Sequence, residues 1–237
     1  MQIILLAGGR GSRLGGVNKA LLRRSPELAP APPASESAGS APSRPPLTGP
    51  EPVRSTAAGP TLLQQWVSAL AARDITGVVV GDAVLGEHLP PAAESGMGPP
   101  LVLTREDPPF AGPAAAVCAG VRALPTPADP AGGQVMLCAV DIAEPAPLLD
   151  WLLEAARSHP HTAVLPRDGA GRDQWLASIV EARWLRERVA EIPPGEEEGQ
   201  SLRWLLSSAQ PLRIPLPAGL GHDIDDPHQA RRFGVQL

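Results

Sequence analysis

The first nineteen residues, MQIILLAGGRGSRLGGVNK, constrain the fold of this chain more than any other stretch. Residues 2–7 are predicted to be a buried strand that ends in a loop, because residues 3–6 form a short apolar run and two glycines follow at 8 and 9. Glycines at positions 8, 9, 11, 15 and 16 permit positive φ and leave room for backbone N–H groups to converge on an anion. Arg10, Arg13 and Lys19 supply countercharge. The stretch therefore predicts a strand followed by an anion-binding loop.

Two common phosphate-binding loops do not fit this glycine pattern. The dinucleotide fingerprint requires a glycine where Leu14 stands, and the Walker pattern requires a lysine directly after Gly16. Lys19 is nevertheless unusual, because it is the only lysine while the other 19 basic residues are arginine. A compact ammonium on a flexible stem can follow a phosphate through a reaction, so we interpret Lys19 as a functional cation rather than a chance survivor at the surface.

The stretch LAGGRGSRLGGVNKALL resembles the nucleotide-binding opening of the molybdenum cofactor guanylyltransferase (MobA-like) family of nucleotidyltransferases, whose motif runs L-A-G-G-x-x-x-R-M-G-x-x-K. Leu14 replaces the usual methionine. The resemblance implies that a nucleotide is bound by Leu6, Ala7, Gly8, Gly9, Gly11, Ser12, Arg13 and Lys19. Within this set we expect Arg13 and Lys19 to hold the β- and γ-phosphates and to take part in catalysis.

Composition narrows the class of partner and the compartment. Only 3% of residues are aromatic, none is tyrosine, and the net charge is −5, which argues against a nucleic-acid binder. Cys118 and Cys138 lie in apolar stretches without a CxxC spacing, as buried thiols do in a reducing compartment. The first apolar run is too short for a signal sequence or a membrane span. We expect a cytoplasmic protein that binds small molecules and neither nucleic acid nor membrane; the composition leaves the oligomeric state open.

Beyond the first motif, short apolar strands alternate with amphipathic helices. Strands are predicted at 77–81, 101–104, 134–140 and 212–216. Helices are predicted at 61–73, 114–124, 145–158, 184–192 and 202–208. The alternation predicts an α/β fold with a mainly parallel sheet, which the resemblance refines to a three-layer α/β/α, Rossmann-like domain of the nucleotide-diphospho-sugar transferase type. Strands at 162–167 and 174–180, joined by a polar turn, predict an antiparallel extension.

Residues 25–60 interrupt this pattern. Ten of the 30 prolines fall there, among alanine, serine and glycine with few large apolar side chains. Such a segment buries too little surface to offset the entropy of ordering it. We therefore expect residues 1–237 to form a single domain that carries a disordered insertion at 25–60. The simplest interpretation is an inert insertion; a role in covering the nucleotide is left open.

Two aspartates are predicted to hold a metal ion. Asp141 follows the apolar strand at 134–140, and ligands of open α/β sheets bind at the carboxyl ends of strands. Because Mg²⁺ takes oxygen ligands and keeps several waters, one or two carboxylates suffice. Asp141 is therefore predicted to be a catalytic Mg²⁺ ligand, with capping of the next helix as the alternative. Asp225 resembles part of the family's N-x-N/D-x-P ending and is predicted as a second ligand, whereas Asp226 before Pro227 is a predicted helix cap.

The stretch TREDPPFAGP at 104–113 is predicted to contact the base. It resembles a family segment in which an acidic residue followed by GPLAG lies against the nucleotide base, which implies binding roles for Asp107 and Gly112. A carboxylate can accept hydrogen bonds from both N1–H and the amino group of guanine. The alternative for Asp107 is a turn residue before proline.

These residues predict a Mg²⁺-dependent nucleotidyltransferase. The resemblance implies GTP as donor, molybdopterin as acceptor and pyrophosphate as the second product. CTP as donor, a sugar phosphate as acceptor, and a regulatory protein that binds a nucleotide without catalysis are the alternatives. Arg167, Arg172 and Asp173 could contact an acceptor phosphate, although a solvated turn is the commoner explanation for such residues.

Overall fold

The computed structural model describes residues 1–9, 16–25, 59–90, 101–125 and 133–236. Most of the predicted insertion at 25–60 lies outside the described residues. Three predicted nucleotide ligands, Gly11, Ser12 and Arg13, also lie outside them. The roles given to these residues, and the single-domain organisation, stay predictions.

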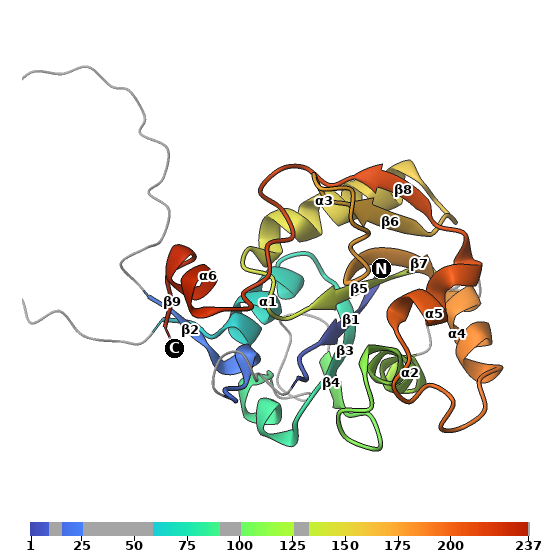
Figure 1. Cartoon of the computed structure of the whole chain (residues 1–237), viewed down its shortest axis with the longest axis horizontal. Helices are drawn as coiled ribbons and strands as arrows, with labels where there is room; N and C mark the ends of the chain where they lie inside the picture. The colour runs from blue at the N-terminus through green and yellow to red at the C-terminus, as the bar shows by residue number, and fades with distance from the viewer. Residues whose placement is uncertain (10–15, 26–58, 91–100, 126–132, 237) are drawn as a thin grey trace, which may run out of the picture.

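A seven-stranded sheet with the order β4-β3-β1-β5-β7-β6-β8 forms the centre of the protein (Figure 1). Its strands are β1 (Gln2–Leu6), β3 (Thr76–Val80), β4 (Leu101–Thr104), β5 (Gln134–Ala139), β6 (Val164–Arg167), β7 (Ala177–Glu181) and β8 (Leu212–Pro215). Strand β7 runs antiparallel to both of its neighbours, while the other pairs are parallel. The predicted mainly parallel sheet with an antiparallel extension is confirmed.

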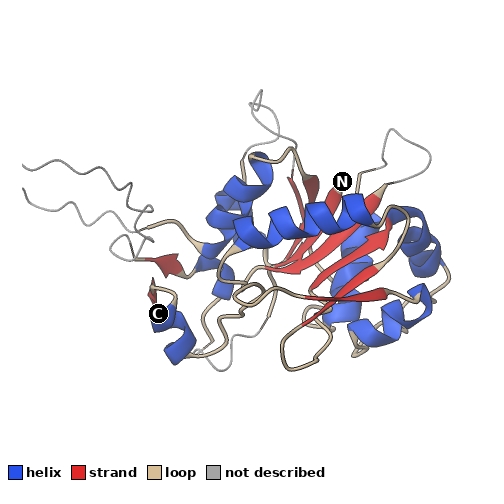
Figure 2. Cartoon of the chain, turned by 90° about the horizontal axis from the view of Figure 1, so that it is seen from above, coloured by secondary structure: helices blue, strands red, loops and turns tan. Residues whose placement is uncertain are grey.

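Helices cover both faces of this sheet (Figure 2). Along β1, Ile3 and Leu5 pack with α1 (Leu62–Ala71) and α3 (Pro145–Ser158), because successive side chains of a strand point to opposite faces. Ile4 packs on the other face with α2 (Pro113–Ala123), α4 (Ala182–Ala190) and α5 (Leu202–Leu206). The result is the predicted three-layer α/β/α arrangement. No described helix is both long enough and apolar enough to cross a membrane.

Local signals place the helix starts close to the predicted ones. Thr61 accepts a hydrogen bond from the N–H of Gln64, whose side chain accepts in return from Thr61, so a capping box begins α1. Helix α2 begins at Pro113 after Gly112, whose φ of 103° is a conformation that favours glycine. The predicted cap at Asp226 is confirmed, because its side chain accepts from two N–H groups at the start of α6 (Pro227–Arg232).

The predicted strand at 174–180 begins later than expected. Residues Trp175 and Leu176 form a turn, with the N–H of Ala177 donating to the carbonyl of Gln174, and β7 starts only at Ala177. The apolar run alone suggested a longer strand. This turn places Trp175 just before the start of β7, where its side chain lines the cleft described below.

A second, two-stranded sheet pairs a segment that follows Lys19 with the last described residues of the chain. Strand β2 (Arg23–Arg24) pairs antiparallel with β9 (Val235–Gln236), next to α6 (Figure 1). Three short 3-10 helices, at Lys19–Leu21, Ala83–His88 and Ser207–Ala209, complete the described elements. A small buried cluster that includes Leu22, Ile224 and Val235 holds this sheet to the body of the protein. Neither strand was predicted, because each is only two residues long.

Both cysteines are buried free thiols, as predicted from their apolar surroundings. Burial raises the pKa of Cys118 to about 11 and raises the pKa of Cys138 further still. These thiols therefore stay protonated and unreactive at neutral pH.

Candidate active site

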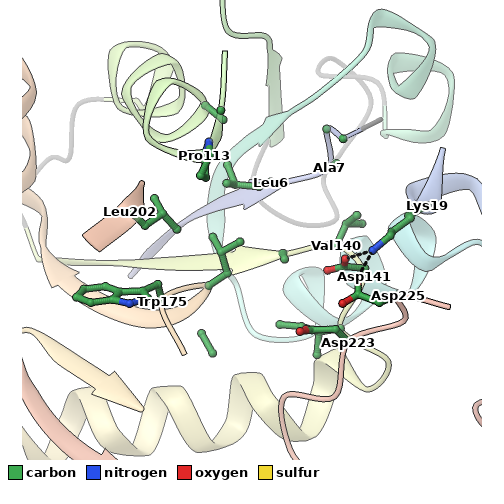
Figure 3. A pocket seen from close by; sticks show the side chains of 18 of the residues that line it. Leu6, Ala7, Lys19, Pro113, Val140, Asp141, Trp175, Leu202, Asp223 and Asp225 are labelled. Carbon is green, nitrogen blue, oxygen red and sulfur yellow. Dashed lines mark hydrogen bonds and ion pairs between the residues drawn. The ribbon is translucent and has the colours of Figure 1, made fainter. Parts of the chain in front are cut away.

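A cleft of about 1000 Å³ lies at the carboxyl ends of β1 and β5. Of the residues predicted to bind nucleotide or metal, the cleft is lined by Leu6, Ala7, Gly8, Gly9, Lys19, Gly112, Asp141 and Asp225. These residues come from five separate stretches of the chain. Figure 3 shows Lys19 and the aspartates at one end of the cleft, and Trp175 and Leu202 at the other.

Lys19 forms ion pairs with both predicted metal ligands, Asp141 and Asp225. Its Nζ lies 2.7 Å from Oδ2 of Asp141 and 2.5 Å from Oδ1 of Asp225, and it donates a hydrogen bond to each (Figure 3). The side chains of Lys19 and Asp141 are only 22% and 19% exposed. Burial alone lowers the pKa of Lys19, but the two carboxylates outweigh it and raise that pKa above its ordinary value. Lys19 is therefore a charged ammonium at neutral pH.

Backbone pairing brings Asp225 to Asp141, although 83 residues, 142–224, lie between them in the sequence. Residues Ile142 and Asp223 form an antiparallel bridge. The N–H of Ile224 donates to the carbonyl of Asp141 at 2.9 Å, and the N–H of Ala143 donates to the carbonyl of His222 at 2.9 Å. Because Ile224 is fully buried, the side chain that follows it turns toward the cleft.

Buried contacts fix the backbone immediately before Asp141. The N–H of Val140 donates to the carbonyl of Leu6 at 2.9 Å, which continues the pairing of β1 with β5. The indole N–H of Trp66, a fully buried residue of α1, donates to the carbonyl of Val140 at 3.2 Å. Both polar groups are thereby satisfied inside the core. Asp141 therefore follows a residue whose backbone N–H and carbonyl are both fixed by hydrogen bonds.

A third carboxylate adds negative charge at the same end of the cleft. Asp223 lines the cleft, and desolvation together with the carboxylates of Asp141 and Asp225 raises its pKa to about 7. Against these three acids stands the single ammonium of Lys19. Among the described residues, however, no group of three or more His, Cys, Asp or Glu side chains is arranged to hold a metal ion.

The structure does not bring Asp107 to the wall of the cleft. Asp107 is exposed, whereas its neighbour Glu106 is 8% exposed and lines the cleft. Oε1 of Glu106 accepts a hydrogen bond from the N–H of Phe110 at 3.0 Å, and this bond fixes the carboxylate. Two consecutive acids in an irregular segment give no periodicity from which the inward one could be identified. The role assigned to Asp107 therefore fits the position of Glu106.

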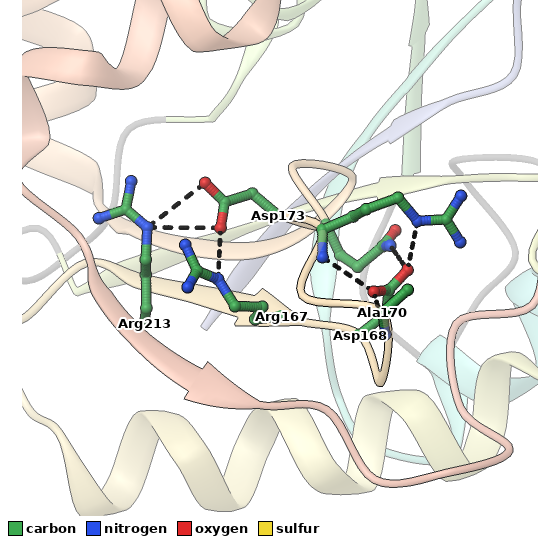
Figure 4. Close-up of polar contacts among 7 residues, drawn as sticks. Arg167, Asp168, Ala170, Asp173 and Arg213 are labelled. Atoms are coloured by element: carbon green, nitrogen blue, oxygen red, sulfur yellow. Dashed lines mark hydrogen bonds and ion pairs between the residues drawn. The ribbon is translucent and has the colours of Figure 1, made fainter.

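The arginines suggested for an acceptor phosphate do not line the cleft. Asp173 pairs with Arg167 at 3.1 Å and with Arg213 at 3.3 Å, and Asp168 pairs with Arg172 at 2.9 Å (Figure 4). Hydrogen bonds from the backbone N–H and the guanidinium of Arg172 lower the pKa of Asp168. This arrangement matches the alternative interpretation, a turn stabilised by its own ion pairs.

Sequence reasoning missed the opposite end of the cleft. Its lining includes the turn before β7 and the start of α5, with Gln174, Trp175, Leu176, Ser201, Leu202 and Arg203. The turn was read as part of a strand, and the helix as an ordinary amphipathic one. The pairing of β7 with β5 carries the turn to the cleft, whereas a hydrogen bond from the N–H of Ala114 to the carbonyl of Gln200 holds the start of α5 beside α2. No signal within either segment distinguishes it from a core element.

Residues 49–211 match the family described as MobA-like NTP transferase domain. The matched range contains Glu106, Gly112 and Asp141 but neither Lys19 nor Asp225. No curated protein matches the chain.

Solved structures with a similar fold include three of stated identity. A 2-C-methyl-D-erythritol 4-phosphate cytidylyltransferase from Thermus thermophilus is 17% identical, with a TM-score of 0.54 over 98% of this chain and 96% of that one. The UTP-bound UGPase from Acinetobacter baumannii is 9% identical, with a TM-score of 0.59 over 98% and 91%. The manganese complex of Rv0371C from Mycobacterium tuberculosis is 15% identical, with a TM-score of 0.50 over 99% and 98%. These likenesses show the fold alone.

Proposed function

The chain belongs to the MobA-like NTP transferase family, and we propose that it transfers the nucleoside monophosphate of GTP to a phosphate group of molybdopterin and releases pyrophosphate. One observation carries this proposal: Lys19, Asp141 and Asp225 meet in a cleft of about 1000 Å³ at the carboxyl ends of parallel strands. Small-molecule sites commonly span about 300 to 1000 Å³, so this cleft has room for two substrates.

The residues at this end fit a divalent cation. Asp141 and Asp225 present hard oxygen ligands that converge on one point, which the ammonium of Lys19 reaches. Mg²⁺ needs only one or two carboxylates when substrate phosphates and water complete its coordination. Desolvation, together with the carboxylates of Asp141 and Asp225, raises the pKa of Asp223, and a cation would offset the charge of these carboxylates. A Mg²⁺ ion held by Asp141 and Asp225 would neutralise charge on the α-phosphate of the donor.

In the proposed reaction, an oxygen of the acceptor phosphate bonds to the α-phosphorus as the bond from that phosphorus to the β-phosphate oxygen breaks. Negative charge then grows on the departing pyrophosphate. Lys19 stays charged, as its raised pKa requires, and its flexible stem lets the ammonium leave the carboxylates for the pyrophosphate oxygens. Positioning and charge neutralisation account for most catalysis of this kind.

Glu106 supports guanine as the base. Its carboxylate is buried in the cleft wall, and the bond from Phe110 occupies only one of its two oxygens. A carboxylate offers about four acceptor positions, enough to take the N1–H and the amino group of guanine together. Cytosine has no N1–H donor to offer in a nucleotide. This residue therefore favours GTP over CTP as donor.

Pyrophosphate release tests the proposal directly. The purified protein is incubated with Mg²⁺, each of the four triphosphates in turn and either molybdopterin or a sugar phosphate as acceptor, and the organic product is identified by mass. We expect release with GTP and formation of the guanine dinucleotide. Release with CTP would instead identify a cytidylyltransferase, release only with a sugar phosphate would change the acceptor, and release with no combination would indicate a nucleotide-binding regulator.

A further inference from the structure

Among the residues that the structure describes, a second cation lines the cleft and has no acidic partner. Among the described residues that line the cleft, the basic ones are Lys19 and Arg203. Lys19 is held by two carboxylates, whereas no described carboxylate lies within ion-pair distance of the exposed Arg203. Other arginines of the same half of the protein, such as Arg167, Arg183 and Arg213, pair with acids. Arg203 is therefore charged, accessible and available to a ligand.

An apolar, partly aromatic wall adjoins this arginine. Leu202, the residue before Arg203, is buried and lies beside Trp175 at the end of the cleft away from Lys19 (Figure 3). Trp175 is half-buried and belongs to a turn, so part of its indole ring faces the cleft. A large, flat indole suits stacking with a planar ring. The wall and the arginine together offer one flat apolar surface and one anion-binding group.

From this arrangement we infer that Trp175 and Arg203 form the acceptor subsite, which takes a molecule combining a planar heterocycle with a phosphate monoester. This inference rests on the proposed function. Arg203 binds the phosphate, because a planar guanidinium can donate two parallel hydrogen bonds to it. Trp175 stacks on the ring. Neither residue takes part in holding the donor triphosphate, which lies toward Glu106 and Lys19.

Hydrogen bonds from neighbouring polar residues hold the backbone that carries Trp175 and Arg203. Nε2 of Gln174 donates to Asp168 at 3.0 Å, which holds the turn that carries Trp175 in place. Ser201 caps α5 by accepting from the N–H of Trp204, which fixes the helix that carries Arg203. Both recognition side chains therefore project from anchored backbone. A subsite built this way selects its ligand with little reorganisation.

Separate binding and rate measurements on Arg203→Ala, Arg203→Lys and Trp175→Phe test the inference. Binding of molybdopterin is followed by quenching of tryptophan fluorescence, and binding of GTP by calorimetry. We expect Arg203→Ala to weaken molybdopterin binding and raise its KM by about tenfold or more, the effect of losing a charged hydrogen bond, with GTP affinity unchanged. Arg203→Lys restores part of the affinity. Trp175→Phe removes most of the quenching signal.

Arg183→Ala is the matched control, because Arg183 is exposed, pairs with Glu187 and does not line the cleft. The inference is overturned if Arg203→Ala binds molybdopterin as tightly as this control, if it weakens GTP binding instead, or if the wild-type protein shows no saturable quenching. Because binding is measured without turnover, failure of the proposed reaction remains distinguishable: Arg203-dependent binding without pyrophosphate release would leave the subsite standing and remove the transfer activity.

Discussion

The two ends of the cleft are built on opposite principles. At the Lys19 end, three acids and one base come from distant stretches of the chain, and Lys19 pairs with two of the three acids. At the Trp175 end, the residues come from one turn and one short helix, and no described carboxylate pairs with Arg203. We infer from this contrast that the Lys19 end acts on the phosphates, which all triphosphates share, and that the Trp175 end selects the acceptor.

The largest effect is expected at the Lys19 end. Lys19→Ala should lower kcat by about a hundredfold or more, the scale on which one transition-state donor acts. The loss should be the same for every acceptor, because Lys19 acts on the leaving pyrophosphate. Single-turnover rates with GTP measure it, and Lys19→Arg shows whether charge alone suffices. Near-normal turnover in Lys19→Ala would remove the catalytic assignment and, with it, the contrast between the two ends.

Asp141→Ala should remove Mg²⁺-dependent activity while the fold is retained. One of two proposed carboxylate ligands is lost. Because losing even an outer-shell partner of a metal ligand costs about tenfold to a hundredfold in metal affinity or activity, losing a ligand itself should cost at least that much. Rates measured across a Mg²⁺ titration show the effect, with circular dichroism as the control for folding. If the Mg²⁺ dependence is unaltered, Asp141 is not a metal ligand, and its bond to Lys19 is purely structural.

Glu106→Gln tests whether the carboxylate of Glu106 recognises the base of the donor. The amide keeps an oxygen for the N–H of Phe110 but loses the charge, so the KM for GTP should rise by about tenfold relative to the other triphosphates. Asp107→Asn, an exposed neighbour, should leave the preference unchanged. Steady-state kinetics with competing triphosphates compare the two variants. Equal behaviour of both would show that the carboxylate does not read the base.

Trp66→Phe should have the smallest effect on activity of these variants, because it acts mainly on the stability of the protein. The variant leaves the buried carbonyl of Val140 without the indole donor, which costs about 1 to 3 kcal/mol of unfolding free energy. Denaturant unfolding measures the loss, and Trp151→Phe at a less buried position is the reference. A change in the Mg²⁺ dependence of the variant would further indicate that Val140 positions Asp141. Unchanged stability would contradict the role of this bond.

Local signals explain why much of the fold was predictable. An apolar run halted by glycines predicts β1 and its loop. Asp141 follows β5, at the carboxyl ends of the strands, where ligands of open α/β sheets bind. The cap at Asp226 was equally readable, since Asp-Pro is a signature within a few residues. The roles of Gly11, Ser12 and Arg13, like that of the insertion at 25–60, are still predictions, because these residues lie outside the described chain.

Most of the main-sheet strands, their covering helices, the family and the charged residues Lys19 and Asp141 could be identified from the sequence. The folded arrangement was needed to show that Lys19 bonds both Asp141 and Asp225, that Glu106 rather than Asp107 faces the cleft, and that Trp175 and Arg203 line its far end. The difference lies in the range of the interactions. Strand and cap signals act over a few neighbouring residues, whereas a cleft wall depends on pairing between segments that the chain keeps far apart.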